Sequence, residues 1–166
     1  MRRAPTARHR PSFSTAVALI LLLAGVPAHA SDSDAVLEAI ALINQYRSDN
    51  DRARVIRDAR LSRAAHRHAR AMADRDFFSH VGADGSGMGK RATEAGYVWR
   101  LIAENIAAGM AEPIDAVETW IDSPGHRKNL LLRGAAHIGI AHVRIDPDPG
   151  SVTYKDYWVM LLAAPQ

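Results

Sequence analysis

The stretch that decides the fold lies near the C-terminus, where AHIGIAHVRI at 136–145 is followed by VTYKDYWVMLLA at 152–163. Both segments are rich in Ile, Val and aromatic residues, and DPDPG at 146–150 between them has the composition of a turn. This pattern predicts two antiparallel strands that form a hairpin. His137 and His142 lie five residues apart on the first strand, so we expect their side chains on opposite faces of the sheet.

The chain before the hairpin predicts helices. Apolar residues recur every three or four positions over 34–47 and 61–76, and a short helix is expected over 88–95, ending at Gly96. Pro113 suits the first turn of another helix that runs to Asp122, and a further helix is expected to begin after Ser123. Residues 48–60 predict a loop and 97–102 an extended or irregular segment. Helices followed by an antiparallel pair indicate an α+β fold.

The first thirty residues differ from the rest of the chain. Residues 1–14 carry four arginines and no acid, and they precede an apolar run at 16–26 that is too short to span a bilayer. Small residues at Ala28 and Ala30 then suit a cleavage site. The segment 1–30 is therefore interpreted as a secretory signal peptide, which leaves a single domain over 31–166 that is secreted or held in the cell envelope.

The charge of the remaining chain is close to neutral. The whole sequence has 21 Lys and Arg against 18 Asp and Glu, and removing the four N-terminal arginines leaves 17 against 18, a net charge of −1. This balance favours neither a nucleic-acid partner nor an anionic membrane surface, and we expect no transmembrane segment after residue 30. The chain has no cysteine, which excludes disulfides, a thiol nucleophile and thiolate metal sites.

Candidate site residues are the polar positions at which the apolar pattern breaks: His80, Glu104, Asn105, Ser123, His126 and Asn129. Two histidines and a carboxylate on separate loops are compatible with a divalent metal that keeps one coordination position open. His126 would lie in the first turn of a helix, whose positive end favours the neutral imidazole that binds metals.

Ordinary structural roles remain open for the same residues. The side chain of His80 would then hydrogen-bond to the backbone, Glu104 would pair with an arginine, and Ser123 would cap the following helix. His68 lies on the small-residue face of its predicted helix, either as a ligand or as a partly buried, hydrogen-bonded histidine.

Several segments, in order, resemble one known family, the CAP or SCP-like extracellular superfamily. It is named for cysteine-rich secretory proteins, antigen 5 and plant pathogenesis-related 1 proteins, and the chain is most similar to its compact bacterial branch. The resemblance covers about residues 36–163 and rests on LINQYR at 42–47, LSRAAHRHARAMA at 61–73, FSH at 78–80, GY at 96–97, ENIA at 104–107, WIDSPGHRKNL at 120–130, IGI at 138–140 and YW at 157–158.

The resemblance implies a three-layer α-β-α sandwich with a central antiparallel sheet, to which extended chain near Glu104 would add a strand. It also implies a cleft with a tetrad of two histidines and two acids, which holds zinc in some members. His80, Glu104 and His126 match three positions of that tetrad, and Ser123 stands where animal and plant members have a glutamate. Serine is a poor replacement for a carboxylate ligand, so this departure weakens the expectation of zinc or another divalent cation.

Three functions are therefore weighed. The first is a binding module for a lipid, a cell-wall component or a protein partner, with Trp99 and Met110 as apolar candidates near the cleft. The second is a protease or cell-wall hydrolase, in which Glu104 is the general base for a metal-bound water held by His80 and His126, or in which Ser123 and His126 form a nucleophile pair. In the third, the polar cluster is a scaffold that holds the loops together.

Overall fold

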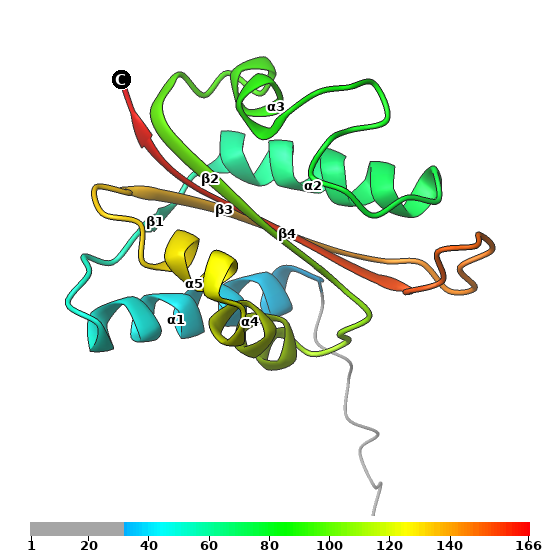
Figure 1. The fold of residues 1–166 in the computed structure, drawn as a ribbon, viewed down its shortest axis with the longest axis horizontal. Coiled ribbons are helices and arrows are strands. Elements are labelled where there is room, and N and C mark those ends of the chain that lie inside the picture. Colours follow the sequence, from blue (N-terminus) through cyan, green and yellow to red (C-terminus); the bar gives the residue numbers. More distant parts are fainter. Residues whose placement is uncertain (1–31) are drawn as a thin grey trace, which may run out of the picture.

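The computed structural model describes residues 32–166, so the expected signal peptide and its cleavage site lie outside the described residues. The elements follow in the order α1 Asp32–Asp49, β1 Ile56–Arg57, α2 Ala59–Asp74, α3 Met88–Glu94, β2 Trp99–Ala108, α4 Pro113–Asp122, α5 Pro124–Leu130, β3 His137–Arg144 and β4 Asp156–Pro165. Helices α1, α4 and α5 cover one face of the sheet, and α2 and α3 cover the other (Figure 1). The α+β class and the three-layer sandwich are thus confirmed.

The sheet has the strand order β1-β3-β4-β2. Strands β2 and β3 both pair antiparallel with β4, as the hairpin pattern and the resemblance predict. The expected central antiparallel sheet is therefore confirmed, and the two-residue strand β1 adds a parallel pair with β3 at one edge, which makes the sheet mixed.

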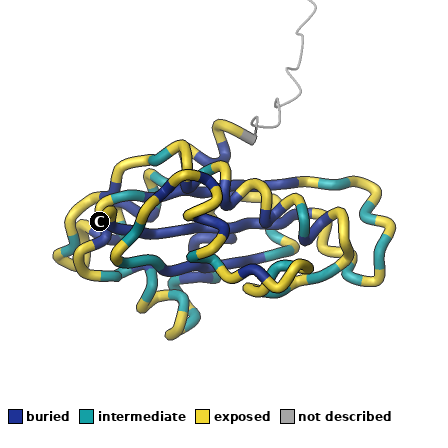
Figure 2. The backbone as a smooth tube through the Cα atoms, turned by 90° about the horizontal axis from the view of Figure 1, so that it is seen from above, coloured by how far each residue is buried: buried dark blue, intermediate teal, exposed yellow. Residues whose placement is uncertain are grey.

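Strand β4 divides the core into two halves. One set of alternate residues packs with α1 and α4: Trp158, Met160 and Leu162. The other set packs with α2 and α3: Tyr157, Val159 and Leu161. This alternation follows from the two-residue period of a strand. Because helices cover both faces, β4 is buried at every position but its last, and buried chain runs through the middle of the molecule (Figure 2).

Helix α2 and strand β3 approach each other very closely at Gly139. A Cβ atom at this position would overlap the backbone of Leu61 and Ser62 in the first turn of α2. Glycine is therefore required by the packing here, and its backbone needs no unusual conformation. The close crossing holds α2 against the sheet and so fixes the position of the loop that follows the helix.

Several predicted boundaries are corrected. The expected loop 48–60 contains β1, and α2 begins at Ala59 because Asp58 caps it by accepting hydrogen bonds from Arg60 N at 2.8 Å and Leu61 N at 3.3 Å. The segment 97–102, expected to be extended or irregular, is continuous with a strand that reaches Ala108. The last strand begins at Asp156, not at residue 152.

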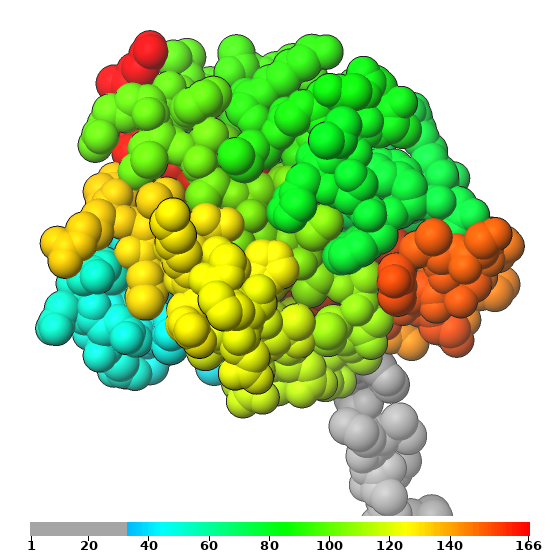
Figure 3. All heavy atoms as spheres, in the orientation of Figure 1, coloured from blue at the N-terminus to red at the C-terminus, as the bar shows by residue number. Residues whose placement is uncertain are grey.

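The late start of β4 has a local cause. The carboxylate of Asp76, just after α2, accepts hydrogen bonds from Ser151 N at 2.9 Å and Val152 N at 2.6 Å. These bonds hold the chain in a loop where the sequence pattern predicts a strand. Figure 3 shows this orange loop lying against the green segment that follows α2.

Candidate functional site

Glu104 is the buried centre of the candidate site. It lies on β2 opposite Leu161, and its side chain is 1% exposed. Oε1 lies 2.9 Å from His80 Nδ1, and Oε2 accepts a hydrogen bond of 2.6 Å from Arg91 Nη2. Both carboxylate oxygens are therefore engaged, and the expected ion pair with an arginine is confirmed.

Arg91, on α3, is the site residue that the sequence analysis missed. Besides the bond to Glu104, its Nη1 donates to the backbone oxygens of His80 at 3.0 Å and Ser86 at 2.5 Å. Arg91 is 6% exposed, and its Nε atom is buried without a partner among the described residues. One buried guanidinium thus ties the loop between α2 and α3 to strand β2.

The sequence carried only a weak signal for this role. Arg91 immediately precedes Ala92 and stands four residues before Ala95, and both alanines are buried, so the arginine is on the inward side of a short helix. That pattern is also compatible with an arginine at the edge of a solvated face. Its partner, Glu104, lies thirteen residues away on a strand, so the spacing of a single helix does not indicate the pair.

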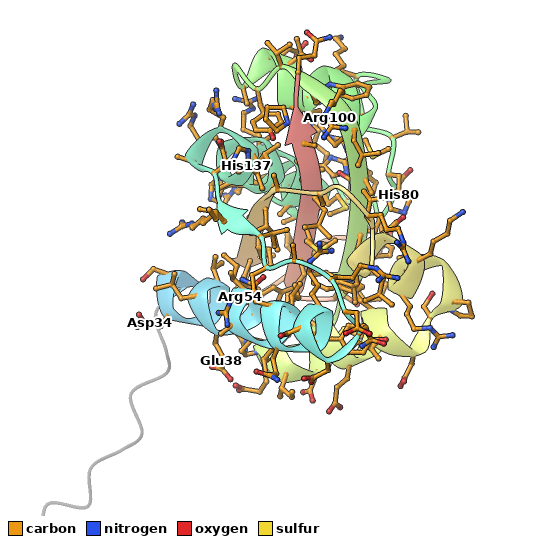
Figure 4. All side chains as sticks on the ribbon, turned by 90° about the vertical axis from the view of Figure 1, so that its left-hand side faces the viewer. Asp34, Glu38, Arg54, His80, Arg100 and His137 are labelled. Carbon is orange, nitrogen blue, oxygen red and sulfur yellow. The ribbon has the colours of Figure 1, made fainter. Side chains whose placement is uncertain are left out.

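His80 lies on the loop before α3, and its side chain is 53% exposed beside Glu104 (Figure 4). The alternative of a side-chain bond to the backbone is wrong for His80. It is correct for His68, which is buried and has Nε2 2.9 Å from Ser79 O. Burial lowers the pKa of His68, and the nearby Arg91 charge lowers it further.

His126 lies in the first turn of α5 on the other side of β2. Its Nδ1 is buried without a hydrogen-bond partner among the described residues. Burial lowers the pKa of His126, and proximity to His80 lowers it further, so the neutral imidazole is favoured. The expected neutral form is supported, although burial and His80 are the causes that the structure identifies.

The two supporting asparagines join α5 to β2. Asn105 donates from Nδ2 to His126 O at 3.0 Å, and Asn129 donates from Nδ2 to Glu104 O at 3.1 Å and to Asn105 Oδ1 at 2.9 Å. Together with Arg91 they connect α3, β2 and α5 around Glu104. These contacts link the sequence-predicted residues, and none of the contacts involves Ser123.

Ser123 occupies the N-cap position of α5, as expected, but its side chain makes no capping hydrogen bond. The expected capping role of its hydroxyl is therefore wrong. Within residues 32–166, no hydrogen bond joins the side chains of Ser123 and His126, so the geometry gives no support to a nucleophile pair, which requires such a bond.

The residues do not fit a resident metal ion. No group of three or more His, Asp or Glu side chains among the described residues is arranged to hold one. The carboxylate of Glu104 is already paired with the Arg91 guanidinium, whose positive charge disfavours a cation at the same place. Serine at position 123 supplies no replacement carboxylate.

A cleft of about 550 Å³ opens beside these residues. His80, Glu104 and Asn129 form its polar part, and its remaining lining is apolar or glycine: Val81, Gly87, Met88, Gly89, Ile102 and Ala103. Figure 3 shows the face on which the green 80–89 segment and the yellow helix α5 meet. This volume is within the range of small-molecule sites, about 300–1,000 Å³.

The two apolar candidates near the cleft have different positions. Trp99 donates from Nε1 to Gly89 O at 3.1 Å and so supports one wall of the cleft. Met110 packs with the other core half, against α1 and α4, and its carbonyl accepts a hydrogen bond from Trp158 Nε1. Trp99 is therefore near the cleft and Met110 is not among its lining residues.

Comparison with known families agrees with this architecture. A family model described as the cysteine-rich secretory protein family, CAP, matches residues 40–162, most of the chain. The chain belongs to this family. The matched region of this CAP domain runs from α1 to β4 and includes every candidate site residue.

Solved structures of two bacterial proteins show a similar fold. An extracellular SCP-domain protein of Bacillus anthracis is 24% identical with a TM-score of 0.70, over 80% of this chain and 41% of that one. An outer surface protein of Borrelia burgdorferi is 18% identical with a TM-score of 0.74, over 82% of this chain and 97% of that one.

Two curated relatives come from Bacillus subtilis. The uncharacterized protein YkwD is 33% identical over 86 residues, 52% of this chain and 34% of its own length. The uncharacterized membrane protein YlbC is 30% identical over 103 residues, 62% of this chain and 30% of its own length. The chain thus spans about a third of the length of these relatives. Among the described residues, no helix is both long and apolar enough to cross a membrane.

Proposed function

We propose that this CAP domain is an exported binding module that takes a small amphipathic ligand, lipid-like in character, in the cleft beside Glu104. The observation that carries the proposal is the cleft itself: about 550 Å³, with an apolar wall facing a polar end. An apolar body would pack on Val81, Met88 and Ile102. A hydrogen-bonding head would reach His80 and Asn129.

The bonding of Glu104 favours binding over hydrolysis. A general base needs a free lone pair to accept a proton from water, and each bond that a carboxylate already accepts reduces the number of such lone pairs. Here Oε1 is held by His80 and Oε2 by Arg91. The same interactions give a rigid polar end, which supports recognition because a preorganised site loses less conformational entropy when the ligand binds.

Export is part of this proposal. The N-terminal pattern of residues 1–30 supports it, and so do two proteins of similar fold, an extracellular protein of Bacillus anthracis and an outer surface protein of Borrelia burgdorferi. We place the domain outside the cytoplasm, in the envelope or beyond it.

The test uses a matched pair of exposed valines. Val81 lines the cleft and is 55% exposed, while Val98 lies outside it and is 56% exposed. The purified protein is titrated with cis-parinaric acid, a fatty acid whose fluorescence rises in an apolar site. We expect saturable binding that Val81→Lys weakens by about tenfold or more, equivalent to about 1.4 kcal/mol, and that Val98→Lys leaves unchanged. Absence of saturable binding, or equal effects of the two variants, would reject the proposal.

A scaffold role is the second candidate, and the three bonds of Arg91 favour it. Its guanidinium bonds Glu104 and the backbone of His80 and Ser86, and such a buried polar network can rigidify a domain without chemistry. The two proposals separate in the His80→Ala, His126→Ala double variant. A large loss of melting temperature with unchanged cis-parinaric acid affinity would favour the scaffold.

A further inference from the structure

A second hollow lies on the outer side of α2, away from the cleft. Its volume is about 520 Å³, and its lining comes from β1 and the first half of α2: Arg57, Ala59, Ser62, Arg63, His66 and Arg67. These residues supply three guanidinium groups and one imidazole, and no acidic residue contributes to the lining. We call this hollow the arginine groove.

The cations of the arginine groove lack acidic partners. None of Arg57, Arg63 and Arg67 forms an ion pair with any described residue. The neighbouring acid Asp58 is paired with Arg60 at 2.7 Å, and Asp74 is paired with Arg70 at 2.8 Å. Residues 31–166 are close to neutral overall, so the net charge does not reveal this local excess of positive charge.

Two of the arginines are held in place. Arg63 donates from Nη2 to Ala95 O at 3.2 Å, and Arg67 donates from Nη2 to Arg91 O at 3.3 Å. Each guanidinium has further N–H groups beyond that anchor. Arg63 and Arg67 are four residues apart, so their Cα atoms are about 6 Å apart along the helix axis.

We propose that the arginine groove binds a soluble chain of phosphate groups. A phosphate presents several acceptor oxygens in different directions, so it can bridge guanidinium groups that arrive from β1 and from α2. A carboxylate has two coplanar oxygens and suits a single guanidinium fork. Cations spaced along the helix, rather than gathered at one point, match a ligand with repeated charges.

The residues that line the groove support a phosphate chain over a nucleic acid. The lining contains no Phe, Tyr or Trp on which nucleic-acid bases could stack. Recognition would therefore rest on the phosphate groups themselves.

The test compares the purified protein with two triple variants of equal charge. One is Arg57→Gln, Arg63→Gln, Arg67→Gln in the arginine groove. The other is Arg100→Gln, Lys128→Gln, Arg133→Gln, at three exposed cations outside it that form no ion pair among the described residues. Short linear polyphosphate is titrated at several salt concentrations. Poly-glutamate of the same charge and vesicles containing phosphatidic acid are tested in parallel.

We expect saturable polyphosphate binding that the groove variant weakens by roughly tenfold, since three exposed ion contacts are lost. The slope of log affinity against log salt should fall by about two, at about 0.7 for each lost contact. The second triple variant should retain the wild-type affinity. Equal losses in both variants, equal affinity for poly-glutamate, or binding to the vesicles alone would overturn the proposal.

Discussion

The substitution Arg91→Met gives the sharpest test of how the polar cluster is held together. It removes the guanidinium from a pair in which the Arg91 side chain is 7% exposed and the Glu104 side chain 1% exposed. The carboxylate would then stay buried next to a methionine, and two backbone oxygens would lose a hydrogen bond.

The expected cost follows from these contacts. Removing one partner of a buried ion pair costs about 3–5 kcal/mol because the other charge is left uncompensated. We therefore expect the free energy of unfolding to fall by about 4 kcal/mol, against a total of about 5–15 kcal/mol for a domain. The control is Arg70→Met, which breaks an exposed pair with Asp74 and should cost less than about 0.5 kcal/mol.

The assay is urea denaturation followed by the fluorescence of the buried tryptophans Trp120 and Trp158, with the slope against urea compared among variants. The double variant Arg91→Met, Glu104→Gln completes a cycle, and we expect a coupling energy of about 2 kcal/mol or more. If Arg91→Met does not fold, Arg91→Lys can be used, because it keeps the positive charge without the two-pronged guanidinium. Its free energy of unfolding should lie between that of the wild type and that expected for Arg91→Met. Additive costs in the cycle, or a cost of Arg91→Met no greater than that of Arg70→Met, would refute the reasoning.

Three further outcomes are expected. Calorimetric titration with zinc at neutral pH should show no saturable one-site binding, because Arg91 already pairs with Glu104. Stoichiometric zinc binding that disappears in the His80→Ala, His126→Ala variant would contradict this expectation. The pKa of His68 is lowered, so the folded state resists protonation of this residue. Its contribution to stability is therefore complete above the unfolded pKa of about 6.5 and is lost as the pH falls. The difference in unfolding free energy between pH 7 and pH 5 should be smaller in His68→Gln, and an unchanged difference would contradict this prediction. Gly139→Ala should lower the free energy of unfolding by about 3 kcal/mol, measured by urea denaturation, because the added Cβ atom overlaps the backbone of α2. Gly125→Ala should cost little, because a Cβ atom there meets nothing within 4 Å. Similar effects of the two variants would contradict the close crossing of α2 and β3.

Much of the secondary structure followed from local pattern. The helices, the hairpin and the α+β class could be predicted because apolar spacing and turn residues act over a few positions. His80, Glu104 and His126 were candidates because they break the apolar pattern, and the resemblance added the three layers and placed these residues in one cleft. Strand β1 escaped prediction because two exposed residues carry no periodic signal, and their pairing with β3 depends on chain about eighty positions away.

What the sequence by itself determined is the order of the helices and of the hairpin strands, and the family to which the domain belongs. Only the tertiary structure decided the partners of the charged groups. The same residue type stands at three positions on neighbouring helices. Arg91 is buried against Glu104, whereas Arg63 and Arg67 line an exposed groove. The physical reason is that burial and electrostatic pairing depend on distance in space, which for these residues is set by how α2 and α3 pack on the sheet.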